Sequence, residues 1–234
     1  MMANYFQPEE NWQVDLNHLE SLIDSNTSAI LLNNPSNPCG SNFTTAHLSA
    51  LLAIASRNFL PIISDEIYAG MNWTAHPFTP LYSLPSDVPI ITIGGLAKRW
   101  LVPGWRVGWV VLHERQGLFT QLRRGISNLS QTQLHPNTVF QTALPTILKT
   151  PKEFFEGVEE VLRGNAKLVV EILGNAKGLT VIEPQGALYA MVGSFIPWRR
   201  YPLLLSLIYV SLNFLGSVWC LSTVSRFFDL MFFD

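Results

Sequence analysis

The chain has 234 residues, of which 48% are apolar and 14% are charged, and its formal net charge is −2. This composition is typical of a chain that buries a sizeable core, and it argues against disorder. With 15 basic and 17 acidic residues, the sequence offers no electrostatic basis for binding nucleic acid.

The number of cysteines and the first ten residues indicate the cellular compartment in which the protein is expected. Cys39 and Cys220 are the two cysteines, too few for a disulfide framework in a chain of this length, so we expect a reducing compartment. Residues 1–10 lack a basic segment followed by an apolar core, which predicts no secretory signal. A cytoplasmic location is therefore the expectation.

The hydrophobic pattern of the first 150 residues predicts helices that alternate with short apolar strands. Apolar residues at helical spacing predict the helices, and short apolar runs that end in polar clusters predict the strands. Thr44 or Thr45 is the expected N-cap of the second helix. The expected helices span 15–24, 46–57, 114–129 and 138–148, and the expected strands span 28–32, 60–63, 88–93 and 107–112.

Such an alternation predicts an α/β fold whose sheet is mostly parallel, with helices on both faces. Ligands of these sheets bind at the carboxyl ends of the strands. Three successive strand ends carry Asn37, then Asp65 with Tyr68, and then Lys98. Their convergence at one edge of the sheet is a stronger signal than any one of them alone.

A second, smaller unit is expected to begin at about residue 151. Pro151 stands at a position that favours the start of a helix, which the pattern extends to residue 174. Strands are expected at 179–183 and 187–192. The predicted division is thus part of a large α/β domain over 1–150, the beginning of a small α/β domain over 151–193, and a divergent apolar tail over 194–234.

Taken singly, the polar residues at the strand ends have ordinary structural explanations. Asn37 belongs to a turn, Asp65 is a candidate helix cap, and Lys98 is a candidate surface lysine. Taken together they match the needs of one cofactor. A nucleophilic amine, an acid for a pyridine nitrogen, donors for a ring oxygen and an arginine for a phosphate are all present.

Three long segments carry a resemblance to a known family. NNPSNPCG, SDEIYAG and GGLAKRWLVPGWRVGW follow one another in this order, and LHPNTVFQTAL and PQGALYAMVG come after them. The chain resembles the fold-type-I, class-I pyridoxal-phosphate aminotransferases over residues 5–193, and within that class it is most similar to the tyrosine aminotransferases.

The resemblance implies a role for each matching residue. Lys98 is similar to the lysine that binds pyridoxal 5′-phosphate and moves the α-proton, and Asp65 to the carboxylate opposite the pyridine nitrogen. Tyr68 and Asn37 match the groups that bind the ring oxygen, and Arg106 matches the phosphate-binding arginine. Where many relatives have a hydroxyl residue three positions before the lysine, this chain has Gly95.

The reaction that the resemblance implies is transamination of an aromatic amino acid, with L-tyrosine as the favoured donor. Its products are the aromatic 2-oxo acid and, from 2-oxoglutarate, glutamate, as part of aromatic amino acid catabolism. The resemblance also implies a homodimer. A catalytically incomplete splice or truncation product, and a membrane-tethered interaction protein, are the alternatives.

Other family features have no counterpart in this sequence. The family is roughly twice as long, so the resemblance implies that 1–150 are the C-terminal part of its cofactor-binding large domain. Its phosphate loop, stacking ring and carboxylate-binding arginine are not found. Residues 201–225 contain no Asp, Glu, Lys or Arg and are long enough to span a bilayer. We favour an alternative exon end or translated non-coding sequence there over a membrane anchor or a soluble core helix.

The remaining aromatic and histidine residues receive structural interpretations. Trp100, Trp105 and Trp109 are expected to pack beside the lysine turn, and Tyr189 to lie near the edge of the small domain with no assigned role. The histidines have no metal-ligand spacing.

Overall fold

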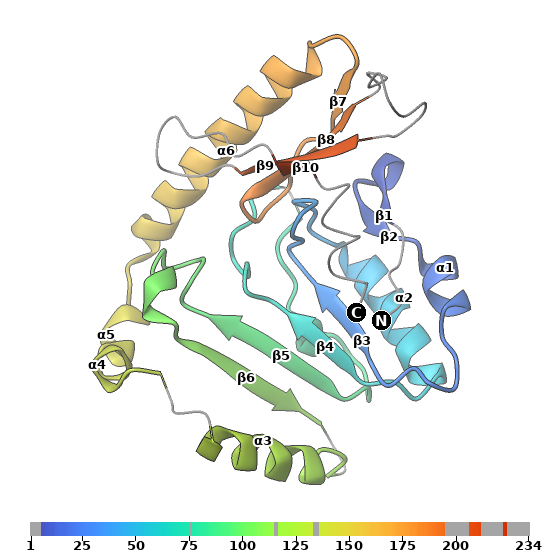
Figure 1. Cartoon of the computed structure of the whole chain (residues 1–234), viewed down its shortest axis with the longest axis vertical. Coiled ribbons are helices and arrows are strands. Elements are labelled where there is room, and N and C mark those ends of the chain that lie inside the picture. Colours follow the sequence, from blue (N-terminus) through green and yellow to red (C-terminus); the bar gives the residue numbers. More distant parts are fainter. Residues whose placement is uncertain are drawn as a thin grey trace.

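A central sheet of four strands organises the first part of the chain. The computed structural model describes residues 6–74, 76–114, 117–132, 136–194, 206–211 and 222–223. The sheet has the order β3-β4-β5-β6 (Figure 1), in which β3 to β5 are parallel and β6 is antiparallel to β5. The strands span Ile30–Asn33 (β3), Ile62–Asp65 (β4), Ile90–Gly95 (β5) and Gly108–His113 (β6).

Two helices, α1 (Leu16–Ser21) and α2 (Thr45–Arg57), cover one face of this sheet. Alternate strand residues point to this face, so Ile30, Ile62 and Ile90 share a core with one side of α2. The α2 residues in that core are Leu48, Leu51, Leu52 and Ala55. The opposite face is less covered at β3, where the next residue along the strand, Leu31, is 60% exposed.

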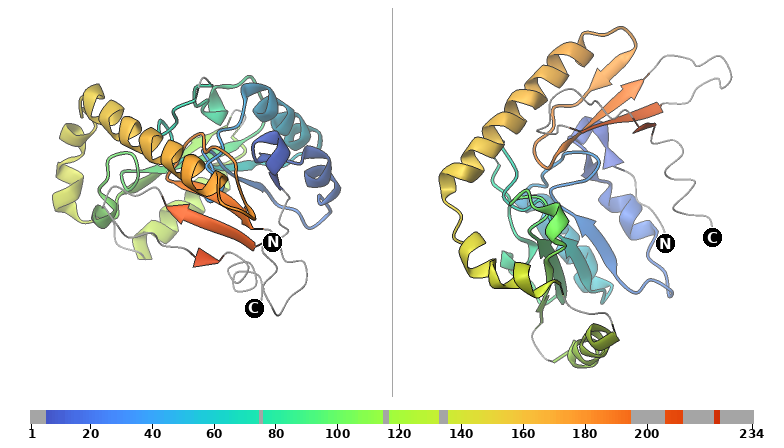
Figure 2. Two further views of the ribbon diagram at one scale, coloured as in Figure 1. Left: turned by 90° about the horizontal axis from the view of Figure 1, so that it is seen from above. Right: turned by 60° about the vertical axis from the view of Figure 1, so that its left-hand side comes forward.

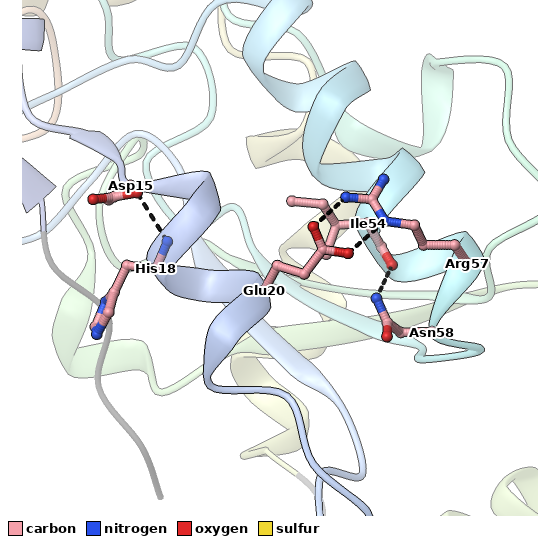
Figure 3. A network of polar contacts seen from close by, with 6 residues as sticks. All are labelled: Asp15, His18, Glu20, Ile54, Arg57 and Asn58. Atoms are coloured by element: carbon pink, nitrogen blue, oxygen red, sulfur yellow. Dashed lines mark hydrogen bonds and ion pairs between the residues drawn. The ribbon is translucent and has the colours of Figure 1, made fainter.

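The ends of α1 and α2 are fixed by side chains. Thr44 caps α2 by accepting a hydrogen bond from the backbone amide of His47 at 3.2 Å, as the sequence predicts. Asp15 caps α1 in the same way, and Arg57 joins the two helices by donating to both carboxylate oxygens of Glu20 (Figure 3). This ion pair is exposed to solvent, which screens it, so it contributes little to stability.

The long helix α6 (Lys152–Gly174) begins directly after Pro151 and packs on a second sheet. This sheet is antiparallel and has the order β10-β9-β8-β7. It lies beyond the carboxyl ends of β3 to β5 (Figures 1 and 2). Its strands span Leu179–Val181 (β7), Tyr189–Ser194 (β8), Ser206–Ser211 (β9) and Ser222–Thr223 (β10).

Between the sheets the chain forms shorter elements, and one expected helix is divided. The pattern at 138–148 predicts one helix, but the structure has α4 (Thr138–Thr142) and α5 (Leu144–Ile147). Pro145 explains the break, because its ring lacks an amide proton and collides with the preceding turn. The other elements are α3 (Thr120–Thr132), β1 (Phe6–Gln7), β2 (Gln13–Val14), and three 3₁₀ turns at Pro8–Glu10, Leu81–Ser83 and Pro103–Trp105.

The fold prediction is confirmed: a mixed, mostly parallel sheet is followed by an α/β unit that begins with a long helix. Most of the apolar stretch 201–225 lies outside the described residues, and its described parts, 206–211 and 222–223, are strands. Within the described ranges, no helix is both long and apolar enough to cross a bilayer.

Candidate functional site

The carboxyl ends of β3, β4 and β5 bring the predicted residues to one edge of the sheet. Asp65 is the last residue of β4, and Lys98 lies in the turn that follows β5. Asn33, which ends β3, donates from its side-chain amide to the backbone carbonyl of Asp65 at 3.1 Å. The parallel order of the strands therefore brings Asp65 and Lys98 to the same edge of the sheet, while Asn37 lies in the loop after β3.

Lys98 lies between two tyrosine rings. Its Nζ atom is 5.4 Å from the ring centre of Tyr68 and 6.0 Å from that of Tyr189. The amine donates a hydrogen bond to the Tyr189 hydroxyl at 3.4 Å, and the hydroxyls of Tyr68 and Tyr189 are 2.8 Å apart. The two rings meet edge to face, with their centres 5.7 Å apart. The amine is thus held at a defined place rather than extended into solvent.

The turn that carries Lys98 is anchored on both sides by its neighbours. The indole Nε1 of Trp100 donates to the carbonyl of Ile147 at 3.0 Å, and the Trp100 ring packs edge to face with Phe155 of α6. The guanidinium of Arg99 lies 4.4 Å from the ring centre of Phe155. The prediction that tryptophans pack beside this turn is confirmed for Trp100 and for Trp109, whose rings meet edge to face.

Asp65 is half-buried and makes a structural hydrogen bond. One carboxylate oxygen accepts the backbone amide of Ile67 at 3.1 Å, as expected of a residue that caps a turn. Burial raises the pKa of the Asp65 carboxyl above its ordinary value, while the Ile67 amide and the positive charge of Lys98 lower that pKa in part. Asp65 and Lys98 are therefore close enough to interact electrostatically.

Asn37 and Arg106 are not brought into this cluster by any contact among the described residues. Asn37 is exposed, and its backbone amide donates to the side chain of Asn33 at 2.6 Å. Arg106 is also exposed, and its Nη1 atom donates to the carbonyl of Pro103 at 3.2 Å. Both residues lie in loops next to the strand ends, and their predicted roles in cofactor binding stay predictions.

Gly95 has a packing explanation. It is the last residue of β5 and pairs with Gly108 of β6. A Cβ atom at this position would lie 3.0 Å from the carbonyl oxygen of Val107 and 3.2 Å from the side chain of Ile67. A hydroxyl-bearing residue here would push apart the two strands that support the lysine turn.

Sequence reasoning missed Tyr189, which joins Lys98 to Tyr68. The sequence predicts it at the edge of the small domain without a role, but the residue is only 7% exposed and contacts the amine. A signal was available, because a tyrosine within an apolar strand needs a partner for its hydroxyl. The identity of that partner could not be read from the sequence, because 91 residues separate it from Lys98.

Known proteins match most of this chain. The family model described as aminotransferase class I and II matches residues 2–194. Bovine tyrosine aminotransferase is 50% identical over 197 residues, which cover 83% of this chain and 44% of the bovine protein. Human tyrosine aminotransferase is 48% identical over the same length, covering 83% of this chain and 43% of the human protein.

Two solved structures share the fold. Alanine aminotransferase from Pyrococcus furiosus aligns with a TM-score of 0.80 and 31% identity, over 83% of this chain and 50% of that one. Tyrosine aminotransferase from Leishmania infantum aligns with a TM-score of 0.78 and 34% identity, over 82% of this chain and 47% of that one. The chain thus spans about half the length of these relatives. On the match of residues 2–194, the chain belongs to the class I and II aminotransferase family.

Proposed function

We propose that the chain derives from, and acts as, a pyridoxal-phosphate-dependent transaminase of aromatic amino acids. L-Tyrosine is the favoured donor and 2-oxoglutarate the acceptor, as part of aromatic amino acid catabolism. The observation that carries this proposal is the placement of the Lys98 amine between two tyrosines and within electrostatic reach of Asp65. The names of the relatives, tyrosine aminotransferases from cattle and man, support the choice of donor.

The residues present fit the cofactor. A primary amine is required to condense with its aldehyde, and Lys98 is held at the sheet edge with its Nζ atom defined. A carboxyl whose pKa is raised by burial can share a proton with a pyridine nitrogen, and Asp65 is such a group. Tyr68 is buried beside the lysine and carries a hydroxyl that can bind the ring oxygen.

The proposed roles of the side chains follow from these positions. Bound pyridoxal phosphate supplies an electron sink that makes the α-proton of the amino acid acidic. The Nζ atom of Lys98 would take up that proton from the α-carbon of the substrate and hold it for its return. Asp65 would hold a proton at the ring nitrogen, Tyr68 and Asn37 would donate to the ring oxygen, and Arg106 would pair with the phosphate.

Lysine replacement tests this assignment. In the full 234-residue chain incubated with pyridoxal phosphate, borohydride reduction should attach the cofactor to Lys98, as read by peptide mass spectrometry. Lys98→Ala should lose the visible absorption band and the transfer of the amino group from L-tyrosine to 2-oxoglutarate, because no other described lysine lies beside Asp65. Lys167→Ala, on the exposed side of α6, is the matched control and should change neither. Persistent tyrosine-dependent glutamate formation in Lys98→Ala would remove Lys98 from the mechanism.

A second candidate function is binding of the cofactor without turnover. The observation that favours it is the alignment with only 44% of the bovine enzyme. Reduction at Lys98 without glutamate formation would assign this function. The same experiment at several protein concentrations, with the molar mass measured by light scattering, tests the homodimer that we propose from the family.

A further inference from the structure

Tyr189 is held in place by contacts that reach it from the loops of the first sheet. The segment before it docks between two of these loops: the amides of Gln185 and Gly186 both donate to the carbonyl of Gly40, at 2.7 and 2.9 Å. The amide of Ala187 donates to the carbonyl of Met71 at 2.8 Å. This docking brings β8 of the second sheet against the lysine turn, although β8 follows Lys98 by about ninety residues of chain.

The donors and acceptors of Lys98, Tyr189 and Tyr68 determine which group donates in each hydrogen bond. A lysine ammonium has donors and no acceptor, so the Tyr189 oxygen accepts from Lys98. The bond of 2.8 Å between the two hydroxyls allows either to donate. A hydroxyl that accepts one bond and donates the next polarises both, whereas an oxygen that accepts twice gains no such reinforcement. The favoured order therefore runs from Lys98 to Tyr189 to Tyr68.

We propose that Tyr189 is a positioning residue for the cofactor lysine. Its hydroxyl holds the Lys98 amine against the two rings and donates to the Tyr68 oxygen, which directs the Tyr68 proton away from Tyr189. The second sheet thereby fixes both the place of the amine and the orientation of the neighbouring hydroxyl. The placement of Lys98 by Tyr189 is independent of the proposed function, and only its use in catalysis rests on that function.

Chemical labelling of Lys98 in the cofactor-free chain tests the proposal. Acetic anhydride at limiting concentration acetylates each lysine at a rate that peptide mass spectrometry resolves, with exposed Lys167 as the internal reference. In Tyr189→Phe the ring remains and the hydroxyl is lost, so the amine is released toward solvent. The labelling of Lys98 relative to Lys167 should rise by about threefold to tenfold, the range that loss of one hydrogen bond gives.

Two further variants separate positioning from a general structural effect. Tyr82→Phe, which removes a hydroxyl from a side chain that is 51% exposed, should leave the ratio unchanged. Tyr68→Phe should change it by less than about twofold, because the bond between Lys98 and Tyr189 remains. An unchanged ratio in Tyr189→Phe, or an equal rise in Tyr68→Phe, would overturn the proposal. If thermal unfolding shows that Tyr189→Phe does not fold, Tyr68→Phe decides alone, with a ratio close to that of the unmodified chain in support.

A second readout separates this inference from the proposed function. With pyridoxal phosphate and borohydride, Tyr189→Phe should still form the Lys98 adduct, but more slowly than the unmodified chain by about threefold or more. If the unmodified chain forms no adduct, the proposed function fails, while the acetylation ratio still decides whether Tyr189 holds the amine. Adduct formation at an unchanged rate, together with an unchanged acetylation ratio, contradicts the inference and leaves the proposed function intact.

Discussion

At the scale of single residues, Asp65 and Glu66 are adjacent at the end of β4, but their carboxyl groups lie in different surroundings. Asp65 faces the edge where Lys98 lies, and Glu66 turns into the core, where it is 7% exposed. One oxygen of Glu66 accepts two hydrogen bonds, from the Ser64 hydroxyl at 2.9 Å and from the Leu81 amide at 3.0 Å. Glu66 thus ties the strand to the turn at Leu81–Ser83 and supports the position of Asp65.

Glu66→Gln should stabilise the chain at neutral pH. Burial raises the pKa of Glu66 above its ordinary value of 4.5, and the two hydrogen bonds lower it only in part. Because the folded-state pKa is raised, the stability that the protonated carboxyl contributes is present below the unfolded value and is lost as the pH rises through the folded value. A glutamine keeps an oxygen for both donors and carries no charge to bury.

Urea unfolding at about pH 4 and about pH 7 checks this prediction. The free energy of unfolding of Glu66→Gln, minus that of the unmodified chain, should be small at the lower pH and increase at the higher one. Glu66→Ala is the control and should destabilise the chain by about 1–3 kcal/mol at both values, since two buried donors lose their partner. A difference that does not change with pH would contradict the assigned titration.

At the scale of elements, the loop after β3 and the segment before β8 form one interface. Gly40 is central to it, because its carbonyl oxygen accepts the amides of Gln185 and Gly186. The backbone of Gly40 has a φ of +67°, a value that residues other than glycine rarely adopt. A Cβ atom at Gly40 would also collide with the carbonyl oxygen of Tyr189 and lie 2.8 Å from the side chain of Pro184.

Gly40→Ala should therefore destabilise the chain by about 2 kcal/mol or more, from backbone strain and overpacking. Thermal unfolding followed by circular dichroism measures the loss. Gly164→Ala is the matched control: this glycine lies within α6, and a Cβ atom there meets nothing within 4 Å. It should stabilise the chain by about 0.5–1 kcal/mol, because alanine is the better helix former. Equal effects at the two positions would show that the interface does not depend on Gly40.

At the scale of the whole molecule, apolar surface remains exposed on β6 and α3. Val110 and Val111 of β6 are 50% and 41% exposed, and β6 is an edge strand of its sheet. Helix α3 exposes apolar residues on successive turns. The apolar residues of α3 that have more than a third of their surface exposed are Leu122, Ile126 and Leu129. An edge strand with exposed valines and a helix with an exposed apolar stripe favour association with other chains.

Val110→Lys should reduce self-association, because a charged residue on an edge strand opposes pairing with another edge. Light scattering of the full chain over a range of concentrations measures the molar mass. Leu168→Lys is the matched control, since Leu168 on α6 is 51% exposed and lies away from the sheet edge. If both variants lower the molar mass equally, general apolar exposure rather than the β6 edge drives association.

Much of the fold and part of the site could be predicted from local sequence. The strands, the Thr44 cap and the start of α6 after Pro151 depend on neighbours within a few residues, and the structure has all of them. Local pattern failed where proline divided the helix at 138–148. The roles of Asn37 and Arg106 also stay predictions. Both residues are exposed in loops, and the hydrophobic pattern of a sequence does not predict the path of a loop.

The sequence by itself determined the family, the order of the strands' polar ends and the identity of Lys98, Asp65 and Tyr68 as candidates. These depend on residue types and spacings along the chain, which a sequence contains in full. Only the tertiary structure decided that Tyr189 contacts Lys98 and that Glu66 is buried beside Asp65. Contacts across about ninety residues arise from how the loops at Gly40 and Met71 dock against β8, and that docking is a property of the folded backbone.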